Sequence, residues 1–378
     1  MKIVLSGVET NNKGAELMLY AILQEIERKW PDADVYISQK RIKQGLNYVK
    51  TSLRLHYFPL ESLIAKTHIN AILWRLKLPT IQVYNFIKGD YFLDGSGFLF
   101  SDQCKLWGTK PEWWEEILKY QQENGARIIF LPQAFGPIEE QRTKQAITVL
   151  NKYSTVIMPR EKVSYDFLNN SGLVDMKKVS IFTDFTSLVE GEFPSKYERL
   201  KGGICIIPNI RMIDKGGLDY EDYIKLLSDI AKEGNKSGHP VYLLNHEGMK
   251  DADLCLRCKE SIGEDVVAVT DLTGLEVKGL IASAYMVITS RFHGLASSLN
   301  SGVPSLATSW SHKYEELFKD YGLDGGYVLP LNDNSQALCK VKSLLERQEN
   351  KRVRTIIEGK VPEVKAQTRD MWKVVWER

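Results

Sequence analysis

An arginine and a histidine stand two positions apart at the end of an apolar segment. The β-branched run at 287–289 is followed by Ser290, Arg291, an aromatic residue, His293 and Gly294. Arginine offers a permanent two-pronged donor to phosphate or carboxylate, and histidine can give or take a proton near neutral pH. On an extended turn both side chains can point to the same side. The segment therefore favours an anion site with a proton donor, and the alternative is a structural arginine beside a satisfied core histidine.

Further cations and polar residues follow other predicted strands. They are Arg160, Arg211, Asn245, His246 and Lys313. Each of them alone has a plain structural explanation; Arg160, for example, could form a surface ion pair with Glu161. Together they concentrate positive charge and histidine at the carboxyl ends of strands, where ligands bind in parallel sheets.

Two loops in the amino-terminal half could also approach a ligand. Asn12, Lys13 and Gly14 precede a predicted helix, whose free N–H groups attract anions. Asp94 and Ser96 belong to an Asp-Gly-Ser-Gly turn, in which glycine lets a ligand lie against the main chain. The first loop matches neither the dinucleotide fingerprint nor the P-loop, and the second is not a nucleophile elbow. A capped helix and a tight turn are the plain alternatives.

A cysteine pair, Cys255 and Cys258, has the spacing of a redox or zinc motif. The chain has no second ligand pair with zinc spacing, and this pair lies inside a helical pattern. We therefore expect no metal site here. The five cysteines of the chain are an odd and scattered set, which is typical of a reducing compartment.

The elements that must position these residues alternate along nearly the whole chain. β-Branched runs are followed by amphipathic helical patterns, the clearest from Gly14 to Trp30, which indicates crossover units and parallel sheets. The predicted strands are 2–6, 35–38, 91–93, 127–131, 155–158 and 179–182, and then 203–207, 241–244, 266–269, 286–289 and 304–307.

A polar stretch with glycine and proline between Val189 and Gly203 interrupts this alternation, as a linker does. A chain of 378 residues usually holds two cores. We predict an α/β fold of two doubly wound parallel-sheet domains facing a cleft. Residues 1–190 form a Rossmann-like domain, residues 200–335 a second one, and residues 336–378 form helices that could cross back to the first.

Charge and hydropathy exclude several classes of protein. The 50 Lys and Arg against 48 Asp and Glu argue against a chain that coats nucleic acid. The amino terminus lacks a signal-peptide core and no 18 apolar residues are consecutive, so we expect a cytoplasmic protein. Residues 40–77, however, hold eight basic residues and one acid, a local charge of +7. With the apolar run 60–78 they predict peripheral contact with the inner membrane face, and a buried helix with solvated ends is the alternative.

Taken together, these segments resemble the polysaccharide pyruvyl transferase family over nearly the whole chain. The supporting stretches are 12–16, 94–97, 131–137, 160–164 and 290–294, the last followed by Gly-Val-Pro at 302–304. The Arg-aromatic-His triplet with its downstream Gly-x-Pro is the specific part of this pattern. The chain departs from the family at Asp94 and Ser96, which replace glycines of a triple-glycine turn, and at Phe185, where proline is common.

The resemblance implies a fold like that of the GT-B glycosyltransferases. It also implies transfer of pyruvate from phosphoenolpyruvate onto two hydroxyls of a sugar as a cyclic ketal, in exopolysaccharide or capsule biosynthesis. The family's Arg-x-His motif falls on Arg291 and His293, and its Arg-acid-x-x-Ser motif falls on Arg160. We expect His293 to be the general acid that protonates the methylene carbon, with Arg291 beside it.

The remaining expected roles follow from this chemistry. Donor-binding residues are Arg160, Arg291, Lys313, Ser290, Gly294, Arg211, Asn245 and His246. Acceptor- or anion-binding residues are Asn12, Lys13, Gly14, Asp94, Ser96 and Gln133. The acceptor is a sugar or a lipid-linked oligosaccharide, and no cofactor is required because arginine and lysine can neutralise the leaving phosphate. A nucleotide-sugar glycosyltransferase of the same shape and a non-catalytic anion-binding module remain the alternatives.

Overall fold

The protein is described by a computed structural model, in which the described residues form two compact units. They are residues 1–38, 41–42, 44–45, 48–57, 69–78, 84–104, 111–214, 216–263, 265–308, 313–331 and 333–377. The first unit comprises Met1–Asn11, Met18–Phe185 and Arg369–Arg378, and the second comprises Asn12–Leu17 and Thr186–Thr368. Residues 12–17 thus group with the second unit, the boundary between the units falls between Phe185 and Thr186, and the last ten residues of the segment 336–378 group with the first unit.

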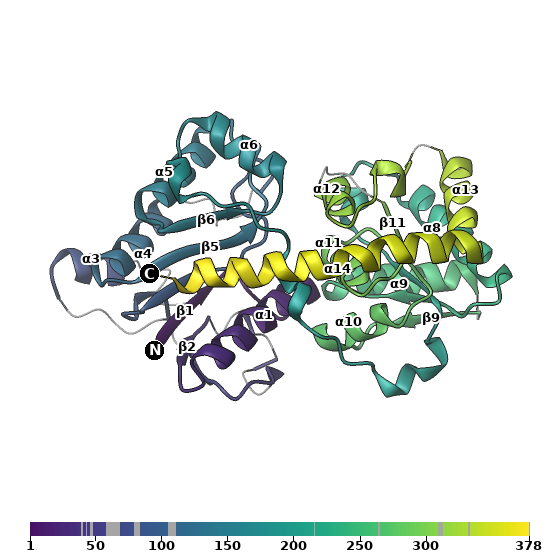
Figure 1. Ribbon diagram of the computed structural model, residues 1–378, viewed down its shortest axis with the longest axis horizontal. Coiled ribbons are helices and arrows are strands. Elements are labelled where there is room, and N and C mark those ends of the chain that lie inside the picture. The colour runs from purple at the N-terminus through teal and green to yellow at the C-terminus, as the bar shows by residue number, and fades with distance from the viewer. Residues whose placement is uncertain are drawn as a thin grey trace. The chain divides into compact units, whose positions relative to one another are not determined.

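The first unit is built on a six-stranded parallel sheet in the order β3-β2-β1-β4-β5-β6. Its strands are β1 (Lys2–Ser6), β2 (Asp34–Tyr36), β3 (Arg54–His56), β4 (Tyr91–Asp94), β5 (Arg127–Gln133) and β6 (Val156–Pro159). Its helices are α1 (Lys13–Lys29, from residue 18), α3 (Ile69–Arg75), α4 (Pro111–Glu123), α5 (Gln141–Tyr153) and α6 (Lys162–Ser171), with short 3-10 turns at Tyr84–Phe86 and Met176–Lys178. Figure 1 shows this unit and labels its helices and the strands β1, β2, β5 and β6.

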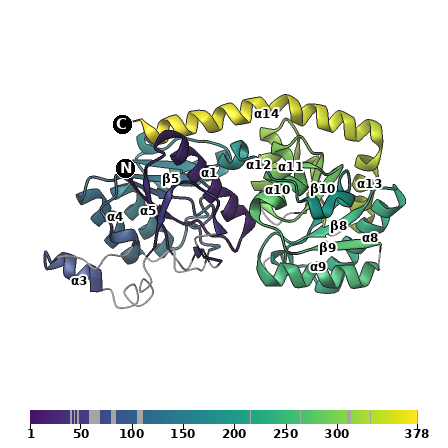
Figure 2. The same cartoon turned by 90° about the horizontal axis from the view of Figure 1, so that it is seen from below.

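The second unit holds another six-stranded parallel sheet, in the order β12-β11-β10-β7-β8-β9. Its strands are β7 (Ile204–Ile207), β8 (Val241–Leu244), β9 (Val266–Val269), β10 (Met286–Thr289), β11 (Ser305–Thr308) and β12 (Val328–Leu329). Its helices are α7 (Arg211–Asp214), α8 (Tyr220–Lys236), α9 (Gly248–Ile262), α10 (Gly274–Ala282), α11 (Phe292–Asn300), α12 (Lys313–Asp320), α13 (Asn334–Leu345) and α14 (Arg347–Trp376, to residue 368). Figure 2 shows the same elements from below.

The end of α14 belongs to the first unit. Arg127 Nη2 donates to the Val374 carbonyl at 2.9 Å, and Trp376 meets Trp30 edge to face with ring centroids 4.9 Å apart. Trp372 is buried against Phe185 in the same way. These aromatic contacts attach the last turns of the chain to the first sheet.

The predicted α/β class with two doubly wound parallel sheets is confirmed. The predicted strand 179–182 is wrong, because only Val179 forms a single bridge, with Ile157, and Ile181 is exposed. Strands β3 and β12 were not predicted. Both are short edge strands of three and two residues with incomplete burial, so their sequences lack the continuous apolar run of a central strand.

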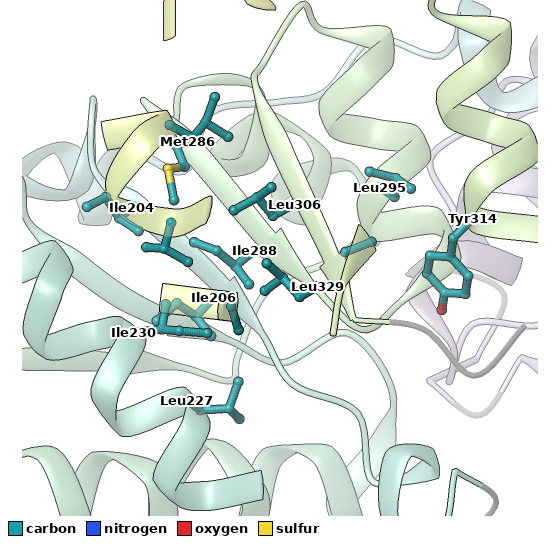
Figure 3. Close-up of a cluster of buried hydrophobic side chains, with 14 of the residues drawn as sticks. Ile204, Ile206, Leu227, Ile230, Met286, Ile288, Leu295, Leu306, Tyr314 and Leu329 are labelled. Atoms are coloured by element: carbon teal, nitrogen blue, oxygen red, sulfur yellow. The ribbon is translucent and has the colours of Figure 1, made fainter. Parts of the chain in front are cut away.

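The core of the second unit explains why its central strands are apolar on both faces. Ile204, Ile206 and Ile288 pack toward Leu227 and Ile230 of α8 (Figure 3). The alternate residues of β7 face a second buried cluster that includes side chains of α10. Each fully buried aliphatic side chain contributes roughly 1.5–3 kcal/mol, so the sheet is a rigid base for the loops at its ends.

The predicted membrane-contact stretch is described only in part. Residues 58–68, which include Lys66, and also Lys40 and Lys43, lie outside the described residues. In and just after α3, Ile72, Leu76 and Leu78 are 51%, 63% and 51% exposed, so this part is not a buried helix. Among the helices that the structure describes, none is long and apolar enough to cross a bilayer.

Candidate active site

Each sheet has one pair of neighbouring strands from which the chain continues in opposite directions along the sheet. This pair marks the topological switch point of the sheet. In the second sheet this point lies between β7 and β10, because the chain continues from β7 to β8 and β9 and from β10 to β11 and β12. Doubly wound sheets bind ligands at the carboxyl end of such a switch point. Here these ends lead into Asn209 and Ser290, directly before Arg291 and His293.

Ser290 is held by four buried side chains. Asn209 Nδ2 and the Tyr314 hydroxyl each donate to the Ser290 carbonyl at 2.8 Å. The Tyr223 hydroxyl lies 2.6 Å from Ser290 Oγ, which also hydrogen-bonds the Thr308 hydroxyl. Burial raises the pKa of Tyr223, so this hydroxyl stays neutral. The network fixes the main chain from which the next residue, the arginine, extends.

Arg291 joins the end of β10 to helix α9. Its Nε donates to Asp251 Oδ2 at 2.8 Å, Nη2 lies 2.5 Å from the same oxygen, and Nη1 pairs with Glu247. Burial lowers the pKa of Arg291 to about 10, which still leaves it charged at neutral pH. Two carboxylates therefore neutralise the guanidinium that we expected to face a phosphate. Neither acid was predicted as a site residue; Glu247 lies three residues after the end of β8, and Asp251 lies one turn further along α9.

His293, in the first turn of α11, packs against the start of α1. A methyl group on Gly14 would overlap Nδ1 of the His293 ring and lie 2.5 Å from its Cγ. The Asn12 side chain caps this helix by accepting from the Gly14 N–H at 2.9 Å. Glycine at position 14 is therefore needed for close approach of the imidazole, and the predicted loop 12–14 lies beside the predicted acid.

Glu16 anchors this helix start to the rest of the second unit. It is fully buried, it forms an ion pair with Lys13 at 3.0 Å, and its Oε1 accepts from the Gly274 N–H at the start of α10 at 2.9 Å. The main-chain N–H of Lys13 donates to the His246 carbonyl at 3.1 Å. Glu16 was missed in the sequence, although its spacing to Tyr20 and Leu23 places it on the apolar face of α1.

His246 lies at the end of β8 and is 1% exposed. Neither of its ring nitrogens has a hydrogen-bond partner in the part of the chain that the structure describes. Burial lowers the pKa of His246 well below 6.5, and the charges of Arg291, His293 and Lys13 lower it further. The imidazole is therefore neutral at pH 7. The neighbouring Asn245 shapes this turn by accepting from the Glu247 N–H at 3.2 Å.

The other predicted donor residues of the second unit surround this cluster. Arg211 opens α7, pairs with Asp214 at 3.0 Å and acts electrostatically on Arg291. Lys313 opens α12, with Nζ 5.9 Å from the ring centre of Phe292. A methyl group on Gly294 would lie 2.6 Å from a threonine hydroxyl of β10, so this glycine permits close packing of α11 on its strand.

The switch point of the first sheet, between β1 and β4, carries an acid. Asp94 is fully buried and accepts from Ser96 Oγ at 2.9 Å and from Gln133 Nε2 at 3.3 Å. Burial raises the pKa of Asp94. Gln133 Oε1 is buried without a partner among the described residues. The predicted acceptor group is thus divided, since these three residues belong to the first unit and residues 12–14 to the second.

Arg160 also belongs to the first unit. It is buried at the end of β6, with Nε 3.5 Å from Glu161 Oε2. Ser164 bonds Glu161 and accepts from the Phe135 N–H at 2.8 Å. The Arg-Glu-x-x-Ser pattern therefore folds into one local network, and the pair with Glu161 is buried rather than on the surface.

The cysteine pair has no sign of reactivity. Cys255 and Cys258 are fully buried in α9, and burial raises the pKa of both, that of Cys258 to about 12. Protonated thiols are poor nucleophiles and poor metal ligands. Within the described residues, no group of three or more His, Cys, Asp or Glu side chains is placed to hold a metal ion.

Comparison with solved structures identifies the fold. A putative UDP-N-acetylglucosamine 2-epimerase from Listeria monocytogenes is 10% identical with a TM-score of 0.63, over 99% of this chain and 95% of that one. The Neisseria meningitidis UDP-GlcNAc 2-epimerase bound to UDP-GlcNAc is 10% identical with a TM-score of 0.59, over 100% of both chains. Arabidopsis thaliana UGT89C1 complexed with quercetin is 12% identical with a TM-score of 0.58, over 100% of this chain and 98% of that one.

At such low identity these likenesses show the fold alone, and it is the GT-B type of these epimerases and glycosyltransferases. No curated protein matches this sequence. The model of the family described as polysaccharide pyruvyl transferase, in contrast, matches residues 12–312, which include both the helix start beside His293 and the Arg-Phe-His segment itself. The chain therefore belongs to the polysaccharide pyruvyl transferase family and is a transferase.

Proposed function

We propose that the protein transfers pyruvate from phosphoenolpyruvate onto two hydroxyls of a sugar as a cyclic ketal. The observation that carries this proposal is the cluster of the buried His246 with the partly buried His293, Arg291 and Lys13 at the switch point of the second sheet. Phosphoenolpyruvate carries a phosphate and a carboxylate, so its site needs several cations and N–H donors. The family supports the reaction class, and the cluster supports a doubly anionic donor.

The proposed chemistry starts with a proton delivered from His293 to the methylene carbon of the donor. The resulting cationic carbon is attacked by the first sugar hydroxyl. The carbon–oxygen bond to phosphate then breaks, and the second hydroxyl closes the ketal. One proton ends on carbon and one on phosphate, and the two hydroxyls supply two, so the reaction needs no other reactant. General acid catalysis of this kind is worth about 10²–10⁴ in rate.

The other site residues take roles that match their surroundings. Arg211 and Lys313, which begin helices α7 and α12 of the same unit, neutralise the donor anions. Arg291 positions the turn that carries His293, because its guanidinium is bonded to Asp251 and Glu247. We propose no cofactor for this chemistry.

The acceptor is proposed to bind the first unit. Asp94, Ser96 and Gln133 gather carboxyl, hydroxyl and amide groups at neighbouring strand ends, and sugar hydroxyls are recognised by such groups. The acceptor is a sugar or a lipid-linked oligosaccharide of exopolysaccharide or capsule biosynthesis. A lipid-linked acceptor accords with peripheral contact at the inner membrane face through residues 40–78, where Ile72 and Leu76 are exposed.

The test measures turnover of phosphoenolpyruvate with a panel of sugar acceptors. Phosphate release gives the rate, and mass spectrometry detects the ketal product. His293→Ala should lower kcat by about 10²-fold or more. A near-normal kcat with a raised KM would exclude the general-acid role. Turnover in heavy water should place deuterium in the product methyl group, and its absence would contradict protonation at carbon.

Thermal shift assays separate this function from the alternatives. Phosphoenolpyruvate should raise the melting temperature, because ligand binding to the folded state stabilises it. A shift with nucleotide sugars only would indicate a glycosyltransferase. A shift with phosphoenolpyruvate but no turnover with any acceptor would favour a non-catalytic anion-binding module.

A further inference from the structure

His246 is a buried polar side chain whose bonding is incomplete. It is 1% exposed, and both ring nitrogens are without a hydrogen-bond partner among the residues that the structure describes. Buried side-chain nitrogens nearly always have hydrogen-bond partners, because an unpaired one loses its bonds to water and gains no bond within the protein. A residue that keeps two such atoms at a strand end next to a cationic cluster is expected to have its partner in a ligand.

The surroundings of His246 define which ligand that is. Its carbonyl accepts from the Lys13 N–H, and the His293 ring packs against the next residue of the same helix, Gly14. Both histidines therefore border the first turn of α1. The groups that act electrostatically on His246 are Lys13 at the start of α1, and Arg291 and His293 at the start of α11.

The negative charges nearby are already engaged. Glu247 follows His246 directly in the chain and Asp251 lies one turn further along α9, and both form ion pairs with Arg291. Glu16, on the helix start, pairs with Lys13 and accepts from Gly274. An added dianion would thus meet a histidine that is neutral in the free protein, and its negative charge would favour protonation of that imidazole.

We propose that His246 contacts the phosphoryl group of the donor, takes up a proton when this dianion binds, and gives that proton to the departing phosphate. The inference rests on the proposed function for the identity of the donor. Proton delivery is then divided between two histidines: His293 protonates carbon, and His246 protonates the bridging oxygen as its bond to carbon breaks. The two acceptor hydroxyls release two protons, so both histidines return to their starting states.

The binding step is tested with sulfate, a dianion that does not itself titrate near neutral pH. Calorimetry at pH 7.5 in two buffers with different ionisation enthalpies measures the protons taken up per sulfate bound. The wild type should take up a substantial fraction of one proton. His246→Gln should abolish the uptake and weaken binding about tenfold or more, since a charge-assisted hydrogen bond is lost.

His239→Gln is the matched control. His239 belongs to the same unit, and its ring bonds the Gly202 carbonyl and stacks on Tyr285, away from the cluster. This variant should keep both sulfate affinity and proton uptake. The proposal is wrong if the wild type binds no sulfate, if it binds sulfate without proton uptake, or if the uptake survives in His246→Gln.

A stability measurement separates a ligand-binding role from a structural one. Leucine has a volume close to that of histidine and brings no polar atoms, so His246→Leu should leave the melting temperature unchanged or raise it. A clear fall would indicate that His246 has a structural partner, such as an internal water, and would contradict the proposal.

The turnover assay with phosphoenolpyruvate tests the proposed function separately from the role of His246. Turnover by a wild type that shows no linked proton uptake would exclude the role of His246 alone. Proton uptake with sulfate but no turnover would exclude the pyruvyl transfer and leave a proton-linked anion site. If both hold, the kcat of His246→Gln should fall while its pH profile loses one ionisation.

Discussion

The switch points of the two sheets have the same topology and opposite chemistry. In the first unit the central strand ends carry Asp94, whose bonded side chains, Ser96 and Gln133, are neutral. In the second unit they carry Arg291 and, nearby, His246 and His293. A doubly wound sheet therefore specifies where a ligand can bind, and the residues at its strand ends specify which ligand.

Burial has the same effect on the protonation of the titratable groups at the two switch points. Burial raises the pKa of Asp94 and lowers that of His246, so burial disfavours the charged form in both cases. The cations of the second unit reinforce this effect on His246. We therefore expect one switch point to bind neutral hydroxyl groups and the other to bind an anion.

The largest effect on stability is expected at Arg291, whose ion pairs connect the end of β10 to α9 at the second switch point. Arg291→Ala should destabilise the protein by about 3–5 kcal/mol, because it removes the charged partner of the buried Asp251 carboxylate. Chemical denaturation followed by tryptophan fluorescence measures this. Arg28→Ala, which breaks the exposed pair with Glu25, is the control and should cost less than about 1 kcal/mol. Equal effects of the two substitutions would refute the structural role of Arg291.

The next effect concerns the approach of α1 to the histidine. Gly14→Ala places a methyl group into the His293 ring, so the imidazole must move. We expect kcat for pyruvyl transfer to fall about 10²-fold with the circular dichroism spectrum retained. Gly359→Ala, where a methyl group has no neighbour within 4 Å, should be neutral or slightly stabilising. Full activity of the Gly14 variant would show that the position of His293 is not critical.

A smaller effect is expected at the first switch point. Asp94→Asn replaces a carboxyl whose pKa is raised by burial with a neutral group of the same shape. The free energy of unfolding at pH 7 should change by less than about 1 kcal/mol, whereas the KM for the acceptor should rise. A loss comparable to that of Arg291→Ala would mean that Asp94 is ionised and structurally essential, and the contrast between the two regions would fail.

The smallest effect is a difference in pH dependence. The unfolded chain protonates His246 near pH 6.5 and the folded protein only well below it, so this residue lowers stability as pH falls below 6.5. The contribution is at most about 1.4 kcal/mol per pH unit. Asp94 acts in the opposite direction, because its raised folded pKa makes stability fall as pH rises above 3.8.

Melting temperatures between pH 7.5 and 5.5 measure the histidine contribution. His246→Gln should reduce the loss of stability on acidification, and His239→Gln should not. Identical slopes for the wild type and His246→Gln would show that the folded protein can protonate this histidine readily.

Local pattern was sufficient for most of the strands and for the position of charged residues at their ends. The β-branched run of β10 is buried on both faces, so its continuous apolar sequence clearly predicts a strand. Arg291 and His293 were expected at the end of that strand. Short edge strands such as β3 and β12 bury less, which is why nothing in their sequence identified them. The charge and spacing of residues near strand ends thus indicated an anion site.

Which residues touch was decided only by the tertiary structure. Asp251 is 40 residues from Arg291 in the chain, and Glu16 is 258 residues from Gly274, yet each pair is bonded. The sequence by itself determined the family, the two sheets and the Arg-x-His motif, because these depend on local pattern. Only folding placed Gly14 against His293 and buried the His246 ring without a hydrogen-bond partner among the described residues, since long-range packing sets those contacts and no local spacing encodes them.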